Sequence, residues 1–228
     1  MTAGDLLSGD LEILGILPDS TNYTFLAHLE SGPLVVYKPR RGETPLWDFP
    51  PGTLCNRELA AYLVSEAGGW DFVPLTVIRD GPLGEGAVQA YIEHDGRITA
   101  FELGEEHEEV LRSIAVFDLV INNADRKGGH VLLDPGGKLW AVDHGICFNE
   151  LPKLRTVLWD FIGEKLPEAD LRRVRALCDA ADGSLGAKLG ALLAPGEVAA
   201  LRRRIEAVLR HPQFPPPGPG RPYPWPPV

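Results

Sequence analysis

The segment NNADRKGGHVLL, residues 122–133, carries the side chains of this sequence that are best suited to chemistry. An apolar run precedes it and another follows, yet it holds an acid, two bases, two glycines and a histidine. Asp125 and His130 stand five residues apart, and Arg126 and Lys127 place positive charge beside the acid. An acid that can accept a proton, next to cations that can neutralise phosphate oxygens, suits the transfer of a phosphoryl group.

Asp143 is a second candidate, because it ends the apolar run LWAVD and is followed by a histidine and a glycine. The stretch before it, HVLLDPGGKLWAV, predicts two strands joined by a turn at residues 134–137. In protein kinases the aspartate of the D-F-G motif lies at the end of such a hairpin strand and holds Mg²⁺. The kinase catalytic loop H-R-D-x-x-x-x-N also has the five-residue step that separates Asp125 from His130.

Lys38 is one of only six lysines, and it lies within the apolar strand pattern VVYKP. Side chains alternate between two faces along a strand, so Lys38 shares a face with Val36. A buried ammonium needs an anionic partner, because an unpaired charge in apolar surroundings is too costly. Glu58, in the helix predicted next, is the natural partner, and phosphate is the other. The alternative is an edge-strand lysine whose ammonium reaches water.

Ser20, Thr21 and Asn22 form a polar turn in LGILPDSTNYTF, between two predicted strands. Hydroxyl and backbone N–H groups in such a turn can hold an anion. The turn has neither the G-x-x-x-x-G-K-[ST] pattern of a P-loop nor a dinucleotide fingerprint. Taken alone, it indicates only a turn.

The elements that must position these residues predict an α+β fold. The first third of the chain predicts a three-stranded antiparallel meander, a helix over 53–69, and two further strands around the turn GPLGEG. The second half is mostly helical, and the predicted hairpin is inserted between helices. Its helices are expected over 105–121, 168–181 and 196–210.

The tail HPQFPPPGPGRPYPWPPV is too rich in proline to form a helix or an inner strand. It is expected either to be disordered or to lie on the domain through Tyr223 and Trp225. A ligand for a proline-recognising partner is a further alternative.

Taken together, the order of these segments resembles the phosphatidylinositol 3-/4-kinase-like group, near the HipA-like kinases. That group often follows its strand lysine with proline, as in YKP, and uses a D-R-x-x-x-N loop, close to DRKGGH. The resemblance covers roughly residues 10–165 and implies a protein-kinase-like fold of two lobes. We expect a β-rich N-lobe with one helix and a reduced helical C-lobe.

The resemblance implies one kinase-like domain over residues 1–210, with lobes of about 1–92 and 93–210 and a hinge near 89–96. The proline-rich tail, 211–228, follows the domain. The resemblance also implies an ATP- and divalent-metal-dependent phosphotransferase that acts on a hydroxyl group of a protein or small molecule. A lipid is disfavoured as the acceptor. Transfer of AMP, with the nucleotide inverted, remains an alternative.

Roles for individual residues follow from the same resemblance. Asp125 would serve the acceptor hydroxyl, with Arg126 and Lys127 beside the phosphates, while Asp143 and His130 occupy the metal positions. The nucleotide-binding residues would be Ser20, Thr21, Asn22, Lys38, Glu58, Gln89, Tyr91 and Ile92, of which the last three would line the adenine slot.

Three positions depart from the group's pattern. His130 stands where the group has asparagine, and imidazole suits Mn²⁺ better than Mg²⁺, which prefers oxygen ligands. Lys127 replaces the usual histidine after D-R, and His144 replaces the aromatic residue of D-F-G. A pseudokinase, which binds nucleotide or acts as a scaffold without transferring phosphate, is therefore an alternative. A transition-metal site of His130, Asp143, His144 and Cys147 is another.

Composition bounds the remaining classes of function. The net charge of −10 disfavours nucleic acid and anionic membrane surfaces as partners. No apolar run approaches the roughly 18–20 residues of a membrane span, and the first residues lack the pattern of a signal peptide. Three cysteines without a CxxC pair predict reduced thiols and a cytoplasmic location.

Overall fold

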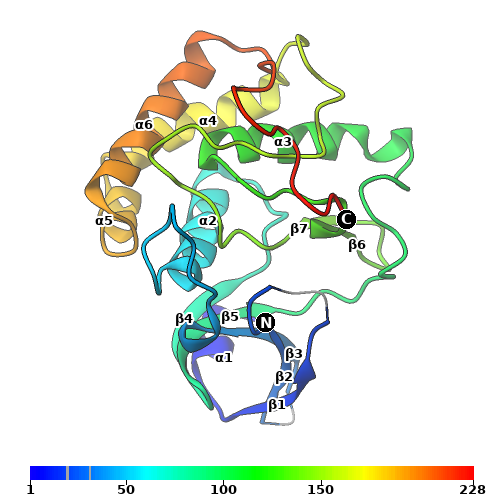
Figure 1. The fold of residues 1–228 in the computed structure, drawn as a ribbon, viewed down its shortest axis with the longest axis vertical. Helices are drawn as coiled ribbons and strands as arrows, with labels where there is room; N and C mark the ends of the chain where they lie inside the picture. Colours follow the sequence, from blue (N-terminus) through cyan, green and yellow to red (C-terminus); the bar gives the residue numbers. More distant parts are fainter. Residues whose placement is uncertain (19–20, 31) are drawn as a thin grey trace.

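The computed structural model describes residues 1–18, 21–30 and 32–228. One half of the molecule is an antiparallel sheet in the strand order β1-β2-β3-β5-β4 (Figure 1). The first three strands confirm the predicted meander. The strands are β1 (Leu11–Ile16), β2 (Phe25–Leu29), β3 (Leu34–Pro39), β4 (Thr76–Gly81) and β5 (Gly84–Ala90).

The turn between β4 and β5 is tighter than expected. Only Pro82 and Leu83 separate the two strands, so part of the predicted turn GPLGEG belongs to β5. Gly86 pairs with Pro39, and a Cβ atom there would lie 2.4 Å from the carbonyl oxygen of Lys38. Only glycine therefore lets β5 approach β3 beside the lysine.

The other half of the molecule is helical, apart from the hairpin of β6 and β7 (Figure 1). The four long helices confirm the predicted ones. Helices α1 and α5 were not predicted, because their five and seven residues are too few to show a helical repeat of apolar positions. The helices are α1 (Ala3–Leu7), α2 (Leu54–Gly68), α3 (Glu108–Ile121), α4 (Glu168–Ala181), α5 (Ser184–Gly190) and α6 (Pro195–Arg210). The hairpin strands are β6 (Val131–Leu133) and β7 (Leu139–Ala141), and 3-10 turns occupy Arg40–Gly42, Glu105–His107 and Gly128–His130.

Two hydrophobic cores divide the molecule in the same way. The smaller lies on one face of the sheet, with Val35 and Tyr37 of β3 fully buried. The larger unites α2, α3, α4, α6 and the hairpin. Because α2 adds Ala60, Ala61 and Val64 to the larger core, it ties the sheet half to the helical half. This arrangement confirms the expected α+β fold, although α1 adds a second helix to the sheet half.

The tail lies against the helical half (Figure 1). Its anchors are buried Phe214 and Pro224, whereas Tyr223 and Trp225, the side chains expected to hold it, are exposed. Among the described residues, no helix is long and apolar enough to cross a membrane.

Asp170 of α4 joins three parts of the helical core. Its carboxylate is fully buried and accepts hydrogen bonds from Trp70 Nε1 and from Ser113 Oγ of α3, each at 2.8 Å. The guanidinium of Arg173 forms an ion pair with Asp170 Oδ1 at 2.9 Å. A buried carboxylate is tolerated only when its lone pairs are satisfied in this way.

Asp170→Ala should therefore destabilise the protein by about 2–4 kcal/mol, because Trp70 and Ser113 would keep buried donors without an acceptor. Urea unfolding measures the change. Glu168→Ala is the matched control: it removes an acid from the same first turn, whose ion pair with Arg175 is exposed, and it should lower the stability far less than Asp170→Ala does. Equal losses of unfolding free energy in the two variants would show that the buried hydrogen bonds of Asp170 contribute no more to stability than an exposed ion pair does.

Candidate active site

Lys38 lies at the centre of the candidate active site. Val36 and Lys38 are half-buried on one face of β3, while Val35 and Tyr37 are buried on the other. The Lys38 ammonium contacts Glu58 Oε1 of α2 and lies 3.0 Å from Asp143 Oδ1. Burial works against the charge, but the carboxylates of Asp143 and Glu58 outweigh it and raise the pKa of Lys38. The ammonium is therefore charged and joins a strand, a helix and the segment after the hairpin.

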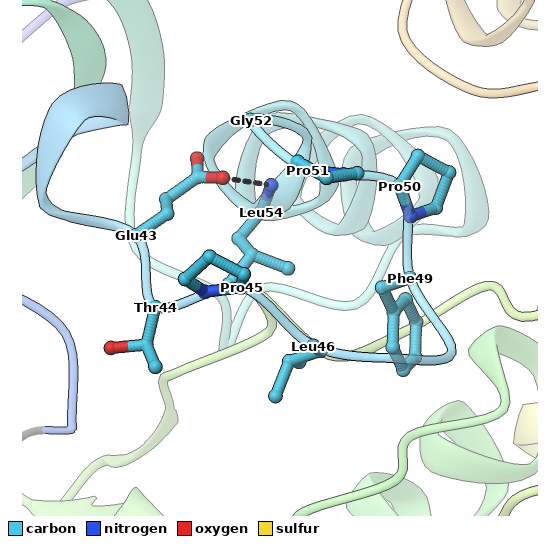
Figure 2. Close-up of a pocket in the computed structure, with 9 residues that line it drawn as sticks. All are labelled: Glu43, Thr44, Pro45, Leu46, Phe49, Pro50, Pro51, Gly52 and Leu54. Atoms are coloured by element: carbon cyan, nitrogen blue, oxygen red, sulfur yellow. Dashed lines mark hydrogen bonds between the residues drawn. The ribbon is translucent and has the colours of Figure 1, made fainter.

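Glu58 is fixed by the way α2 begins (Figure 2). The carboxylate of Glu43 accepts hydrogen bonds from the first backbone N–H groups of the helix, those of Leu54 and Cys55, at 3.1 and 2.9 Å. A carboxylate at a helix N-terminus also interacts favourably with the helix dipole. Glu58 then receives a second donor, the backbone N–H of His144, at 3.1 Å. The helix is thus held at its start and again at Glu58.

The segment that carries Glu43 encloses a small pocket, drawn in Figure 2. Its volume of about 20 Å³ has room for a water molecule but not for a nucleotide. We therefore assign this segment to holding α2, and we do not assign it to ligand binding. The lining residues are Glu43, Thr44, Pro45, Leu46, Phe49, Pro50, Pro51, Gly52 and Leu54.

Asp125, His130 and Asp143 come together beside Lys38. One potential ligand atom from each of the three lies within 4.8 Å of the other two. Asp143 has a φ of 60°, a left-handed conformation that costs a residue with a side chain on the order of 1 kcal/mol. Such strain is commonly held at functional sites. Although burial disfavours its charge, the Lys38 ammonium keeps the pKa of Asp143 below its usual range.

His130 has the protonation state of a metal ligand. Burial lowers the pKa of its imidazole to about 4, so the ring is neutral at pH 7. Nδ1 lies 2.9 Å from the Asp125 carbonyl oxygen, which can only accept, so Nδ1 carries the proton. Nε2 then presents a lone pair to Asp143 Oδ2 at 3.2 Å.

A cation fits between these two acceptor atoms. Two lone pairs that face each other without a proton repel, and a shared cation removes that repulsion. Adjacent ligands of an octahedral ion with bonds of about 2.1 Å lie about 3.0 Å apart, close to the observed separation. The residues present therefore suit a divalent metal, with one nitrogen and at least one carboxylate oxygen as ligands.

Asp125 is partly buried and faces Lys127. Burial raises the pKa of its carboxyl to about 6, with Lys127 acting in the opposite direction. The Lys127 ammonium lies 3.7 Å from Asp125 Oδ2. Asp125 N donates to the side-chain oxygen of Asn123 at 2.9 Å, which fixes the start of the loop. The carboxylate is thus a proton acceptor near neutral pH, with a cation beside it.

Arg126 does not face phosphate, and its predicted place beside Asp125 at the phosphates is wrong. Its side chain is fully buried and donates to both carboxylate oxygens of Asp118, at 2.9 and 3.0 Å. It also donates to the carbonyl oxygens of His130 and Val142, at 3.1 and 2.8 Å. These hydrogen bonds engage the fully buried guanidinium, which therefore braces the loop against the hairpin.

Sequence reasoning missed Asp118 and Asn123, which hold this loop. Asn123 Nδ2 donates to Asp118 Oδ1 at 2.9 Å, and Asp118 is itself fully buried in α3. The sequence does contain a signal for Asp118, because this acid lies inside the apolar run AVFDLVI and, if buried, needs a cationic partner.

The predicted phosphate turn is described only in part. Ser20 lies outside the described residues. The Thr21 carbonyl oxygen accepts from Thr44 Oγ1 at 2.9 Å, and Asn22 Oδ1 accepts from Thr44 N at 2.7 Å. The turn is therefore braced against the segment that caps α2, and the Asn22 side-chain oxygen is already engaged.

The predicted adenine slot is partly used by the sheet itself. The Gln89 side chain is buried and donates to Thr76 Oγ1 at 2.8 Å, so it faces the neighbouring strand. Tyr91 N donates to Leu34 O at 3.2 Å. The Ile92 carbonyl oxygen lies 2.8 Å from His94 Nδ1. Each of the three residues predicted for the adenine slot thus has at least one polar group engaged within the protein.

His144 and Cys147 point away from the Asp125–His130–Asp143 cluster. His144 Nε2 contacts the Arg126 guanidinium at 2.8 Å, and its ring packs edge-on against Phe117. Cys147 is fully buried in the helical core. Among residues 1–18, 21–30 and 32–228, the three-residue cluster is the one group found that could hold a metal ion.

Solved structures of kinases share the fold of this chain. A crystal structure of the Golgi casein kinase with Mn and ADP bound has a TM-score of 0.60 and 15% identity, covering 92% of this chain and 74% of that one. The Helicobacter pylori proinflammatory kinase CtkA has a TM-score of 0.59 and 10% identity, covering 92% and 95%. The kinase-like fold is thereby confirmed.

No family model matches the chain. One curated protein does match along nearly its full length: Protein Rv2133c of Mycobacterium tuberculosis is 41% identical over an alignment of 259 positions, which covers 97% of this chain and 93% of that protein. This chain belongs to the same family as Protein Rv2133c.

Proposed function

We propose that this chain is a divalent-metal-dependent phosphotransferase that uses ATP and acts on a hydroxyl group of a protein or small molecule. The contact of one ammonium, Lys38, with two carboxylates from distant segments, Glu58 and Asp143, carries the proposal. The narrower relationship to the phosphatidylinositol 3-/4-kinase-like and HipA-like kinases belongs to the proposal as well.

Each residue has a defined task in the proposed reaction. Lys38 binds the α- and β-phosphates, and Glu58 orients it. Asp143 and His130 hold the metal, which when bound neutralises the charge of the phosphates. Asp125 accepts the proton of the acceptor hydroxyl while that oxygen bonds to the γ-phosphorus and the bond to the ADP oxygen breaks. Lys127 neutralises charge near the transferred group.

Mn²⁺ is the favoured metal in this proposal. The neutral imidazole of His130 occupies a position that asparagine holds in the resembling kinases, and nitrogen ligands favour Mn²⁺ over Mg²⁺. The Golgi casein kinase structure, with Mn and ADP bound, provides a precedent on the same fold.

Lys38→Met should weaken ATP binding by about 10–100-fold and leave adenosine binding unchanged, because in the proposed site the ammonium contacts the phosphates of the nucleotide and not its adenosine part. Calorimetric titration with both ligands measures the difference. Lys138→Met is the matched control: it removes a lysine that pairs with exposed Asp71 on the surface. Equal losses for ATP and adenosine in Lys38→Met would assign Lys38 a purely structural role.

His130→Asn should move the metal preference toward Mg²⁺ by about 10-fold relative to Mn²⁺, because an oxygen ligand replaces a nitrogen. The ratio of apparent metal affinities in the presence of ATP measures it. His211→Asn, at an exposed position after α6, should leave that ratio unchanged. An unchanged ratio in His130→Asn would remove His130 from the metal site.

Asp125→Asn should lower turnover by at least about 100-fold while changing ATP affinity by less than about threefold, as expected for a lost general base. Release of ADP, or of AMP and pyrophosphate, also separates phosphoryl transfer from AMP transfer. Loss of metal-dependent ATP binding in this variant would instead make Asp125 a metal ligand. A wild-type protein that binds metal and ATP without any turnover would be the pseudokinase.

A further inference from the structure

The proline-rich tail, residues 211–228, reaches the catalytic loop. It leaves α6 and, in the view of Figure 1, runs across α3 toward the β6-β7 hairpin. Phe214 anchors its beginning: the ring is buried against Phe161, with centroids 5.5 Å apart. The Phe214 backbone also exchanges hydrogen bonds of 2.9 Å with Gly163 and Glu164.

Two proline carbonyl groups connect the end of the tail to the loop. The Pro227 oxygen accepts from Gly128 N at 2.8 Å, and Gly128 lies three residues after Asp125 and two before His130. The Pro222 oxygen accepts from Thr156 N and from Trp159 Nε1, both at 3.1 Å.

The second contact also bears on the catalytic loop, through the strand-like segment 155–157. Arg126 N donates to Arg155 O at 3.0 Å, and Val157 N donates to Arg126 O at 3.1 Å. Thr156, which lies between these two partners, donates its own N–H to the tail. The tail thus holds both the loop and the segment that pairs with the loop.

Gly128 has little freedom to find another arrangement. The residue is buried, and a buried N–H without an acceptor costs about 1–3 kcal/mol. A Cβ atom at this position would lie 2.7 Å from the Phe101 ring. Its carbonyl oxygen already accepts from Ala100 N at 3.0 Å, so Gly128 is held on one side by residue 100 and on the other by Pro227.

We infer that residues 221–228 are a positioning element for catalysis, which holds the 125–130 loop in its active geometry through the Pro227 and Pro222 carbonyl groups. This inference rests on the proposed function. Proline suits the task because its ring fixes φ and so reduces the entropy lost when the carbonyl groups are held in place.

Phe214 belongs to the larger hydrophobic core, but no later residue of the tail does, so we expect that the last residues can be removed without loss of the fold. Residues 221–227 line an apolar cavity of about 440 Å³ together with Phe101 and Val157, and the Trp225 ring is 73% exposed. Beyond Phe214, the tail is therefore held by a few backbone hydrogen bonds and by buried Pro224.

Deletion of residues 226–228 tests the inference, because it removes the Pro227 carbonyl and keeps the Pro222 contacts. We expect the Gly128 amide to exchange with solvent at least 10-fold faster. We also expect kcat for Mn²⁺-dependent ATP hydrolysis to fall by about 10–100-fold, as is expected when catalytic groups are misplaced. Unchanged Gly128 exchange together with unchanged kcat would overturn the inference.

Trp159→Phe in the full chain is a milder second variant, since it removes only the indole donor to Pro222. We expect this substitution also to lower kcat, but by less than the deletion. Trp140→Phe is its matched control, because its lost indole bond of 2.9 Å goes to Asp134 in the hairpin turn. Equal effects of the two substitutions on kcat and on Gly128 exchange would contradict the inference.

The readouts separate this inference from the proposed function. If the full chain does not hydrolyse or bind ATP with Mn²⁺, the proposed function fails, and the positioning role in catalysis fails with it. If the full chain is active and the truncated chain keeps both its fold and its kcat, only the role of the tail fails. Circular dichroism establishes that each variant is folded.

Discussion

The contact of the Lys38 ammonium with Glu58 and Asp143 is the constraint on which the rest of the site depends. It forces β3, α2 and the segment after the hairpin to meet at one point, and each of these elements has its own support. Gly86 admits β5 beside Lys38, Glu43 caps the start of α2, and the left-handed Asp143 directs the chain out of the hairpin. Without the anionic partners, a half-buried ammonium in an apolar strand would be too costly to keep.

Charge pairing also explains how the 125–130 loop is held in place. One buried ion pair, Asp118–Arg126, lies beneath the loop and satisfies carbonyl groups on both sides of it. Asp125 and His130 are left to face the site, where an acid and a neutral imidazole meet Asp143. The loop is thus divided by function: a buried residue holds it, and its neighbours remain available for chemistry.

The sequence predicted the elements better than the direction of single side chains. The long helices and the meander follow from apolar periodicity, and the pairing of Lys38 with Glu58 follows from the cost of a buried charge. Arg126 was misassigned because adjacency to Asp125 suggested a shared direction, whereas consecutive side chains in a turning loop point apart. The anchoring of the tail through carbonyl groups could not be predicted at all, since backbone acceptors leave no trace in side-chain pattern.

In the proposed function, Asp143 and His130 would hold a divalent metal that neutralises the nucleotide phosphates. The decisive experiment is calorimetric titration of ATP into the full chain and into Asp143→Asn, each without metal and with Mn²⁺. We expect Mn²⁺ to tighten ATP binding by at least about 10-fold in the natural chain and to have no effect in the variant. Equal Mn²⁺ dependence in both proteins, or ATP binding without any dependence on metal, would contradict the proposed metal site.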